Sequence, residues 1–172
     1  MSTKKTATAS RPASDKEKQA MAITRRYMLW SGGAGLIPFP LIDLATIVGV
    51  QMKMVSEISD VYGVKFSENT AKNTISAALS GVTANTLAQG TLGSSIKSLP
   101  LIGTLVGTIT MPFFASASAY ALGNVFINHF ENGGSFLDLD PAKFTENFKM
   151  MFSRGEKAAK DLKTEVEKPA DN

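Results

Sequence analysis

The sequence contains no cysteine, one histidine and one tryptophan among its 172 residues. Without cysteine, disulfide bonds, thiolate catalysis and cysteine-based metal sites are all excluded. The single histidine, His129, closes an apolar run and is followed by Phe130. An imidazole in that position is more typical of a helix end than of a general base or a metal ligand.

Charge is also missing from a long part of the chain. Between residues 73 and 130 the only charged side chain is Lys97. Residues 98–130 have no charged side chain unless His129 is protonated. A soluble surface normally has a charged residue at about every fourth position. This stretch therefore has little water-facing area of its own.

The charges that are present lie near the two ends. Residues 1–35 have a net charge of +5, residues 36–139 a net charge of −2, and residues 140–172 are neutral. A basic arm beside an apolar region favours contact with anionic lipid headgroups. The alternative is a solvated tail that only keeps the chain soluble. Nucleic acid is not expected as a partner, because no basic stripe is interleaved with aromatic residues.

The sequence has no recognisable catalytic or cofactor-binding motif. No phosphate-binding loop is present, and the glycines at 32–35 do not follow a strand as a dinucleotide loop requires. Asp138 and Asp140 are two residues apart in a loop, which is capping geometry before it is metal geometry. We therefore predict a non-enzymatic protein without a metal or a cofactor.

The hydrophobic spacing predicts an all-α fold, a compact bundle of about four to six helices. We expect a disordered basic tail at 1–20, an apolar helical domain at 21–135, a C-terminal amphipathic helix at 136–168 and a disordered end at 169–172. One apolar stripe runs from Leu41 to Tyr62 after Pro40, and Gly63 is a natural stop in the left-handed region.

The next predicted helices are small-residue and apolar. Ser67 is a good N-cap for a helix over 67–88. Residues 98–130 form two apolar runs, between which Pro112 is expected to break or kink the helix. Small residues recur at four-residue steps and let two helices approach closely, in lipid or in a dense core. The predicted packing positions are Gly103, Gly107, Ala115, Ala119 and Gly123.

A last helix is predicted over 141–167, with Asp140 as its cap and Pro141 in its first position. Phe144, Phe148 and Phe152 share one face of it, and the other face alternates Lys and Glu. Such a helix lies on a membrane interface or packs on its own domain. At the membrane interface we place Arg25, Arg26, Trp30, Phe144, Phe148 and Phe152.

Residues 27–50 and 98–130 are the candidate membrane hairpins. Each is diluted by polar residues, so a buried soluble core is the alternative. The prolines at 38 and 112 favour re-entrant hairpins, and the basic arm places both termini in the cytoplasm. Asp43 is expected to be a structural acid in the first turn after Pro40, or else a functional intramembrane acid. Arg25-Arg26 resembles a twin-arginine export signal, but no cleavage site follows it and we do not expect export.

Several short segments in a fixed order carry a resemblance to a known family. The chain resembles the bacterial domain-of-unknown-function family associated with Era-like GTPases and YcjF-type inner-membrane proteins, over roughly residues 25–135. The resemblance implies a helical domain at the bacterial inner (cytoplasmic) membrane that works beside a GTPase. No catalytic residues are defined for that family, and this chain has no GTPase domain of its own. The segments are residues 37–43, 51–52, 62–63, 99–103 and 120–123, closing on Phe130.

Three hypotheses follow for the function. The first is a non-enzymatic, membrane-associated adaptor or scaffold whose partners are membrane lipid, further copies of itself and a GTPase. The second is a self-assembling oligomer that remodels or perforates membranes, in which the Ser/Thr/Asn-rich helix 67–88 lines water. The third is a soluble helical domain whose apolar surface a partner covers.

Overall fold

The computed structural model describes residues 13–33, 44–88 and 102–167. These residues form five α-helices and no strand, which confirms the predicted all-α class. The helices are α1 (Asp15–Gly33), α2 (Leu44–Tyr62), α3 (Glu68–Ala88), α4 (Ile102–Glu131) and α5 (Pro141–Glu167).

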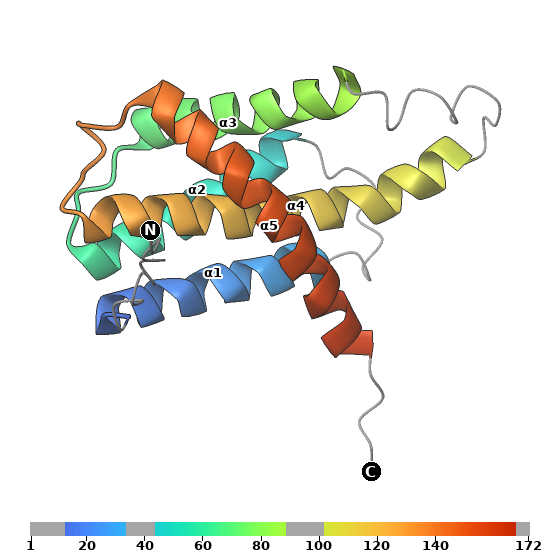
Figure 1. The fold of residues 1–172 in the computed structure, drawn as a ribbon, viewed down its shortest axis with the longest axis horizontal. Coiled ribbons are helices and arrows are strands. Elements are labelled where there is room, and N and C mark those ends of the chain that lie inside the picture. The colour runs from blue at the N-terminus through green and yellow to red at the C-terminus, as the bar shows by residue number, and fades with distance from the viewer. Residues whose placement is uncertain (1–12, 34–43, 89–101, 168–172) are drawn as a thin grey trace, which may run out of the picture.

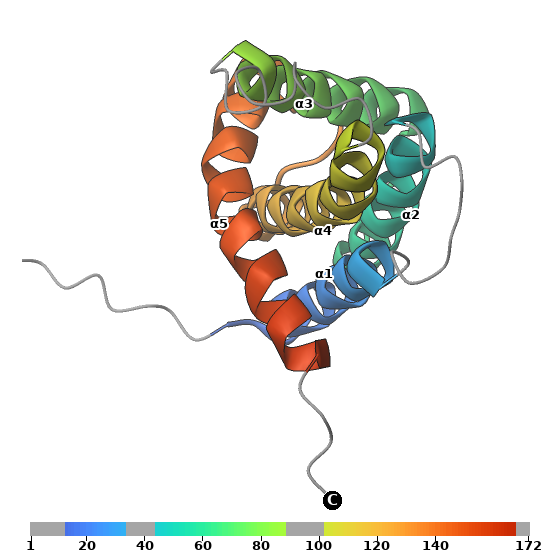
Figure 2. The same ribbon diagram turned by 90° about the vertical axis from the view of Figure 1, so that its right-hand side faces the viewer.

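The central element is α4, with the other helices arranged around it. Figure 2 shows α1, α2, α3 and α5 surrounding α4 when the molecule is viewed along that helix. The contacts between helices agree with this view. α4 packs against α1, α2 and α5, and α3 packs against both α2 and α5. A helix without charge over most of its length is stable when neighbours cover it on every side. This arrangement accounts for the absence of charge along residues 115–127 of α4.

Burial along α4 supports that explanation. Every residue from Ala115 to Ala119 is buried, as are Leu122, Gly123 and Phe126. None of the helices within the described residues combines the length and the apolarity that crossing a bilayer requires. Of the candidate hairpins at 27–50 and 98–130, the described residues 27–33, 44–50 and 102–130 are helical and belong to α1, α2 and α4, which pack against one another.

The beginning of α1 contradicts the predicted disorder of residues 1–20. The helix starts at Asp15, and Ser14 caps it by accepting a hydrogen bond from the backbone N–H of Glu17 at 3.0 Å. Ala20 is fully buried. The disorder was expected because this segment has few large apolar side chains. Here a small side chain is buried instead, where α1 packs against α4. Residues 15–20 were therefore wrongly assigned to the tail.

Local capping signals predicted the other helix ends well. Gly63 has φ +70° and Val64 donates to the carbonyl of Ser59 at 2.9 Å, the pattern of a Schellman cap at the end of α2. At the start of α5, the Asp140 carboxylate accepts from the backbone N–H of Ala142 at 2.9 Å. Ser67 directly precedes α3, and its carbonyl accepts the first helical hydrogen bond from Ala71.

The break predicted at Pro112 is absent, because this residue lies inside α4, a single helix of 30 residues. A proline inside a helix removes the hydrogen bond to the carbonyl four residues earlier, and its ring crowds that carbonyl. The hydrogen bonds on either side can remain when neighbouring helices hold the segment in place. The two apolar runs therefore form one helix.

Small residues lie in the core at three of the predicted packing positions, all of them in α4. Ala115, Ala119 and Gly123 are buried, and a Cβ added at Gly123 would collide with the Thr24 side chain of α1. A second close approach was not predicted: a Cβ added at Gly155 of α5 would lie 2.5 Å from the Ala117 carbonyl oxygen of α4. These contacts let α1 and α5 lie directly on the central helix.

The phenylalanines of α5 do not lie at a membrane interface. Phe144, Phe148 and Phe152 are buried, Phe148 completely. Phe144 stacks on Phe126 of α4 with ring centroids 4.9 Å apart, and Phe152 packs on Phe114 at 5.4 Å. The interface assignment of these three residues was wrong, and the alternative, a helix packed on its own domain, is correct. An amphipathic stripe alone does not identify what covers it.

Three predictions fall on residues outside the described part of the chain. They are the structural role of Asp43, the re-entrant turn at Pro38 and, in the uncharged stretch, the position of the one charged residue, Lys97. Gly103 and Gly107 lie within α4, but what surrounds them is likewise not described.

Candidate functional site

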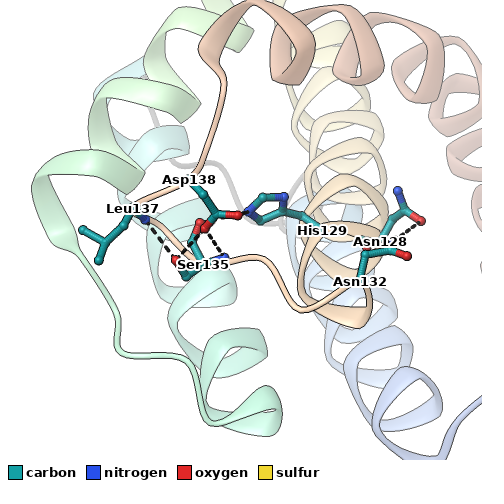
Figure 3. A network of polar contacts seen from close by, with 6 residues as sticks. All are labelled: Asn128, His129, Asn132, Ser135, Leu137 and Asp138. Carbon is teal, nitrogen blue, oxygen red and sulfur yellow. Dashed lines mark hydrogen bonds and ion pairs between the residues drawn. The ribbon is translucent and has the colours of Figure 1, made fainter.

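The corner between α4 and α5 contains a network of polar contacts (Figure 3). His129, in the last turn of α4, points its Nε2 at the Ser135 carbonyl oxygen, 2.9 Å away, and at the Asp138 carboxylate, 3.8 Å away. Asp138 also accepts hydrogen bonds from the backbone N–H and the hydroxyl of Ser135, at 2.6 and 2.5 Å. Hydrogen bonds from the Ser135 hydroxyl and N–H hold the pKa of Asp138 below its usual range.

This network holds the loop between α4 and α5 in place. A cap closes α4 at Gly133, whose φ is +81°, and Gly134 donates to the His129 carbonyl at 3.0 Å. The His129 ring packs so closely that a Cβ on Gly134 would lie 2.5 Å from it. The predicted roles of His129 and Asp138 as helix-end and loop residues agree with this geometry.

Another polar cluster joins the ends of three helices. The Glu131 carboxylate of α4 accepts hydrogen bonds from the Ser14 hydroxyl, just before α1, and from the Tyr62 hydroxyl of α2, the latter at 3.0 Å. Lys16 lies over the Tyr62 ring, 5.9 Å from its centroid. Burial, together with the hydrogen bond to Glu131, raises the pKa of Tyr62 well above its usual value. The cluster therefore ties α1, α2 and α4 together at one end of the bundle.

The α1–α2 hairpin has its own polar contact. Glu57 of α2 pairs with Arg26 and accepts a hydrogen bond from the Tyr27 hydroxyl at 2.7 Å. Burial of the ring and the bond to Glu57 raise the pKa of Tyr27 to about 12. This contact fixes the register of the two antiparallel helices.

One polar side chain lies fully inside the core. Gln51 of α2 donates from Nε2 to the Ala115 carbonyl of α4 at 3.1 Å. Among the described residues, its Oε1 and the Ser118 hydroxyl have no hydrogen-bond partner. A buried amide oxygen without a partner costs about 1–3 kcal/mol.

Of the predicted interface residues, Arg25, Arg26 and Trp30 are on the surface of α1. The Trp30 side chain is 73% exposed, and Leu29 beside it is 38% exposed. Lys53 is exposed on the neighbouring helix α2. Sequence reasoning missed Leu29 as a surface residue, and it missed Leu137, which is 96% exposed in the α4–α5 loop. The spacing of apolar residues could not reveal the exposure of these two leucines, because exposure depends on which helices meet.

Acidic and histidine side chains do not converge on a metal site within the described residues, where no three of them come together. The carboxylates described above are instead bound to hydroxyls, backbone N–H groups or arginine.

Comparison with known sequences identifies the family. Residues 3–157 match a family described as a domain of unknown function, DUF697. The chain belongs to this family. The DUF697 match includes all of α1 to α4 and residues 141–157 of α5, and thus most of the packed core around α4. It confirms the resemblance seen in the sequence.

A relative of this chain has a name that mentions a membrane. The chain is 31% identical over 144 residues to magnetosome membrane protein 22 of Magnetospirillum gryphiswaldense. The matched region covers 84% of this chain and 74% of that protein. No solved structure matches the chain.

Proposed function

We propose that this protein is a non-enzymatic, membrane-associated helical adaptor. The observation that carries the proposal is the 31% identity over 144 residues to a magnetosome membrane protein. A match over 84% of this chain includes the bundle itself and not only a terminal segment. We therefore propose that the folded domain takes part in membrane association.

The use of the polar side chains supports an adaptor over an enzyme. His129, Asp138, Glu57 and Glu131 each bind a partner that fixes a loop or a helix end. Exposed polar surface, such as the charged face of α5, is available for protein partners. By the family resemblance, the partner we propose is a GTPase at the cytoplasmic side of a bacterial inner membrane.

Membrane association is tested by fractionating cells that produce the full chain, without detergent. The proposal expects the protein in the membrane pellet and its release by detergent. Recovery in the supernatant after ultracentrifugation would contradict it and favour the third hypothesis, a soluble domain covered by a partner.

Dye release separates the adaptor from a pore-forming oligomer. An adaptor binds vesicles without releasing an entrapped dye, whereas a pore-former releases it in proportion to bound protein. Copurification in detergent followed by mass spectrometry then tests the GTPase partner. If purified chain binds vesicles but a GTPase is never recovered with it, the adaptor part of the proposal fails and membrane association stands.

A further inference from the structure

We infer that the protein meets an anionic lipid bilayer through one patch on the α1–α2 hairpin, with Trp30 at its centre. The inference rests on the proposed membrane association and specifies the surface that makes it. The hairpin patch consists of Arg25, Arg26, Leu29, Trp30 and Lys53.

The register of the hairpin brings these residues together. Arg26 of α1 pairs with Glu57 of α2, and the two helices run in opposite directions (Figure 1). One helical turn further from this pair, toward the connection between the helices, lie Trp30 on α1 and Lys53 on α2. Both are exposed. An aromatic ring and an ammonium group are thus level with each other on one surface.

The chemistry of the patch fits a lipid interface. Trp30 is 73% exposed, although a tryptophan side chain is large and mostly apolar. Tryptophan is enriched where the headgroups meet the hydrocarbon, since its ring is apolar and its N–H is polar. Arg26 and Lys53, together with the one acid that pairs with Arg26, Glu57, give this part of the hairpin a net charge of +1. Anionic headgroups attract such a surface.

Charge distribution over the bundle favours the same orientation. The opposite end has eight acidic and five basic residues over 15–18, 60–72 and 131–146, a net charge of −3. An anionic membrane repels that end and attracts the hairpin patch. The first residues of α4, 102–112, lie toward the patch end in Figure 1 and contain no charged residue. Both properties direct the Trp30 end of the bundle, and not the acidic end, toward lipid.

The experiment uses the fluorescence of Trp30, which is the only tryptophan in the chain. The full chain is mixed with vesicles of phosphatidylcholine and phosphatidylglycerol, or of phosphatidylcholine alone, and binding is measured by flotation. We expect a blue shift of the emission and quenching by brominated acyl chains, only when phosphatidylglycerol is present. The matched control is the double variant Trp30→Phe/Leu137→Trp, which moves the fluorophore to the opposite end. Its emission should stay that of a tryptophan in water.

A second pair of variants tests the charge. Lys53→Gln should weaken binding to the anionic vesicles about fivefold, the expected effect of one basic residue near the surface. Lys72→Gln, which removes an exposed charge at the other end, should leave it unchanged.

Three other outcomes overturn the inference. If the chain floats but Trp30 stays in water while the tryptophan at position 137 is quenched, the bilayer contacts the other end and membrane association stands. If Trp30 shifts without vesicles as protein concentration rises, a second copy covers the patch. If the chain does not float at all, the proposed function fails with it.

Discussion

At the scale of single residues, Gly155 and Gly49 differ in what a methyl group would meet. A Cβ at Gly155 would lie 2.5 Å from the Ala117 carbonyl oxygen, a backbone atom that cannot move aside cheaply. Gly155→Ala should lower the free energy of unfolding by about 1–3 kcal/mol. Gly49, also inside a helix, has nothing within 4 Å of that position. Gly49→Ala should raise the free energy of unfolding by up to about 1 kcal/mol, because alanine has a higher helix propensity than glycine.

Urea denaturation of the two alanine variants measures the difference. Equal stability of Gly155→Ala and the natural chain would mean that α5 does not lie on α4 as closely as described.

Gln51 gives a prediction of the opposite sign. Its Oε1 is buried without a partner among the described residues, and its one hydrogen bond goes to a carbonyl inside a helix. Methionine has nearly the same shape and removes the unpaired oxygen. Gln51→Met should therefore leave the thermal midpoint unchanged or raise it. A decrease of more than about 1 kcal/mol in the free energy of unfolding would show that the amide contributes a net favourable interaction.

Tyr27 makes stability depend on alkaline pH. Its pKa is raised to about 12 in the folded protein, against about 10 in an unfolded chain. A raised pKa means that the neutral phenol is favoured by folding, so its contribution is complete below pH 10 and is lost as pH rises through about 12. Tyr27→Phe should flatten the fall in urea midpoint over that range. An identical pH profile in the variant would contradict the assigned contact with Glu57.

At the scale of elements, the first turn of α1 depends on Ser14. This residue caps the helix through the Glu17 N–H and also donates to Glu131 at the end of α4. Ser14→Ala removes both bonds and should cost about 1–2 kcal/mol. Hydrogen exchange should accelerate at the amides of the first turn of α1 but not in α3. Uniform acceleration in both helices would mean global destabilisation and not a local cap.

The helix ends that sequence predicted well carry their own local signals. Gly63 and Asp140 each act within four residues, so the sequence around them is sufficient. The start of α1 and the continuity of α4 through Pro112 could not be predicted in this way. Both depend on distant packing: Ala20 is covered only once the bundle has formed, and α4 is held by helices on several sides.

At the scale of the whole molecule, the uncharged run has two physical solutions. It can lie in lipid or inside a shell of helices, and the hydropathy pattern is the same for both. Around residues 115–127 the structure has the second solution. The Phe144, Phe148 and Phe152 face was misassigned for the same reason, since it covers α4 and not a membrane. The interface role of Arg25, Arg26 and Trp30 stays a prediction that the exposure of Trp30 makes testable.

The most direct test of this account is to map which residues touch acyl chains when the protein is bound to a membrane. Vesicles containing phosphatidylglycerol and a lipid with a photoreactive acyl chain are bound to the full chain and irradiated, and the adducts are located by peptide mass spectrometry. The account predicts adducts in peptides spanning residues 25–31 and none over residues 113–130 of α4. Adducts spread along residues 113–130 would contradict it, because α4 would then face lipid and not the surrounding helices.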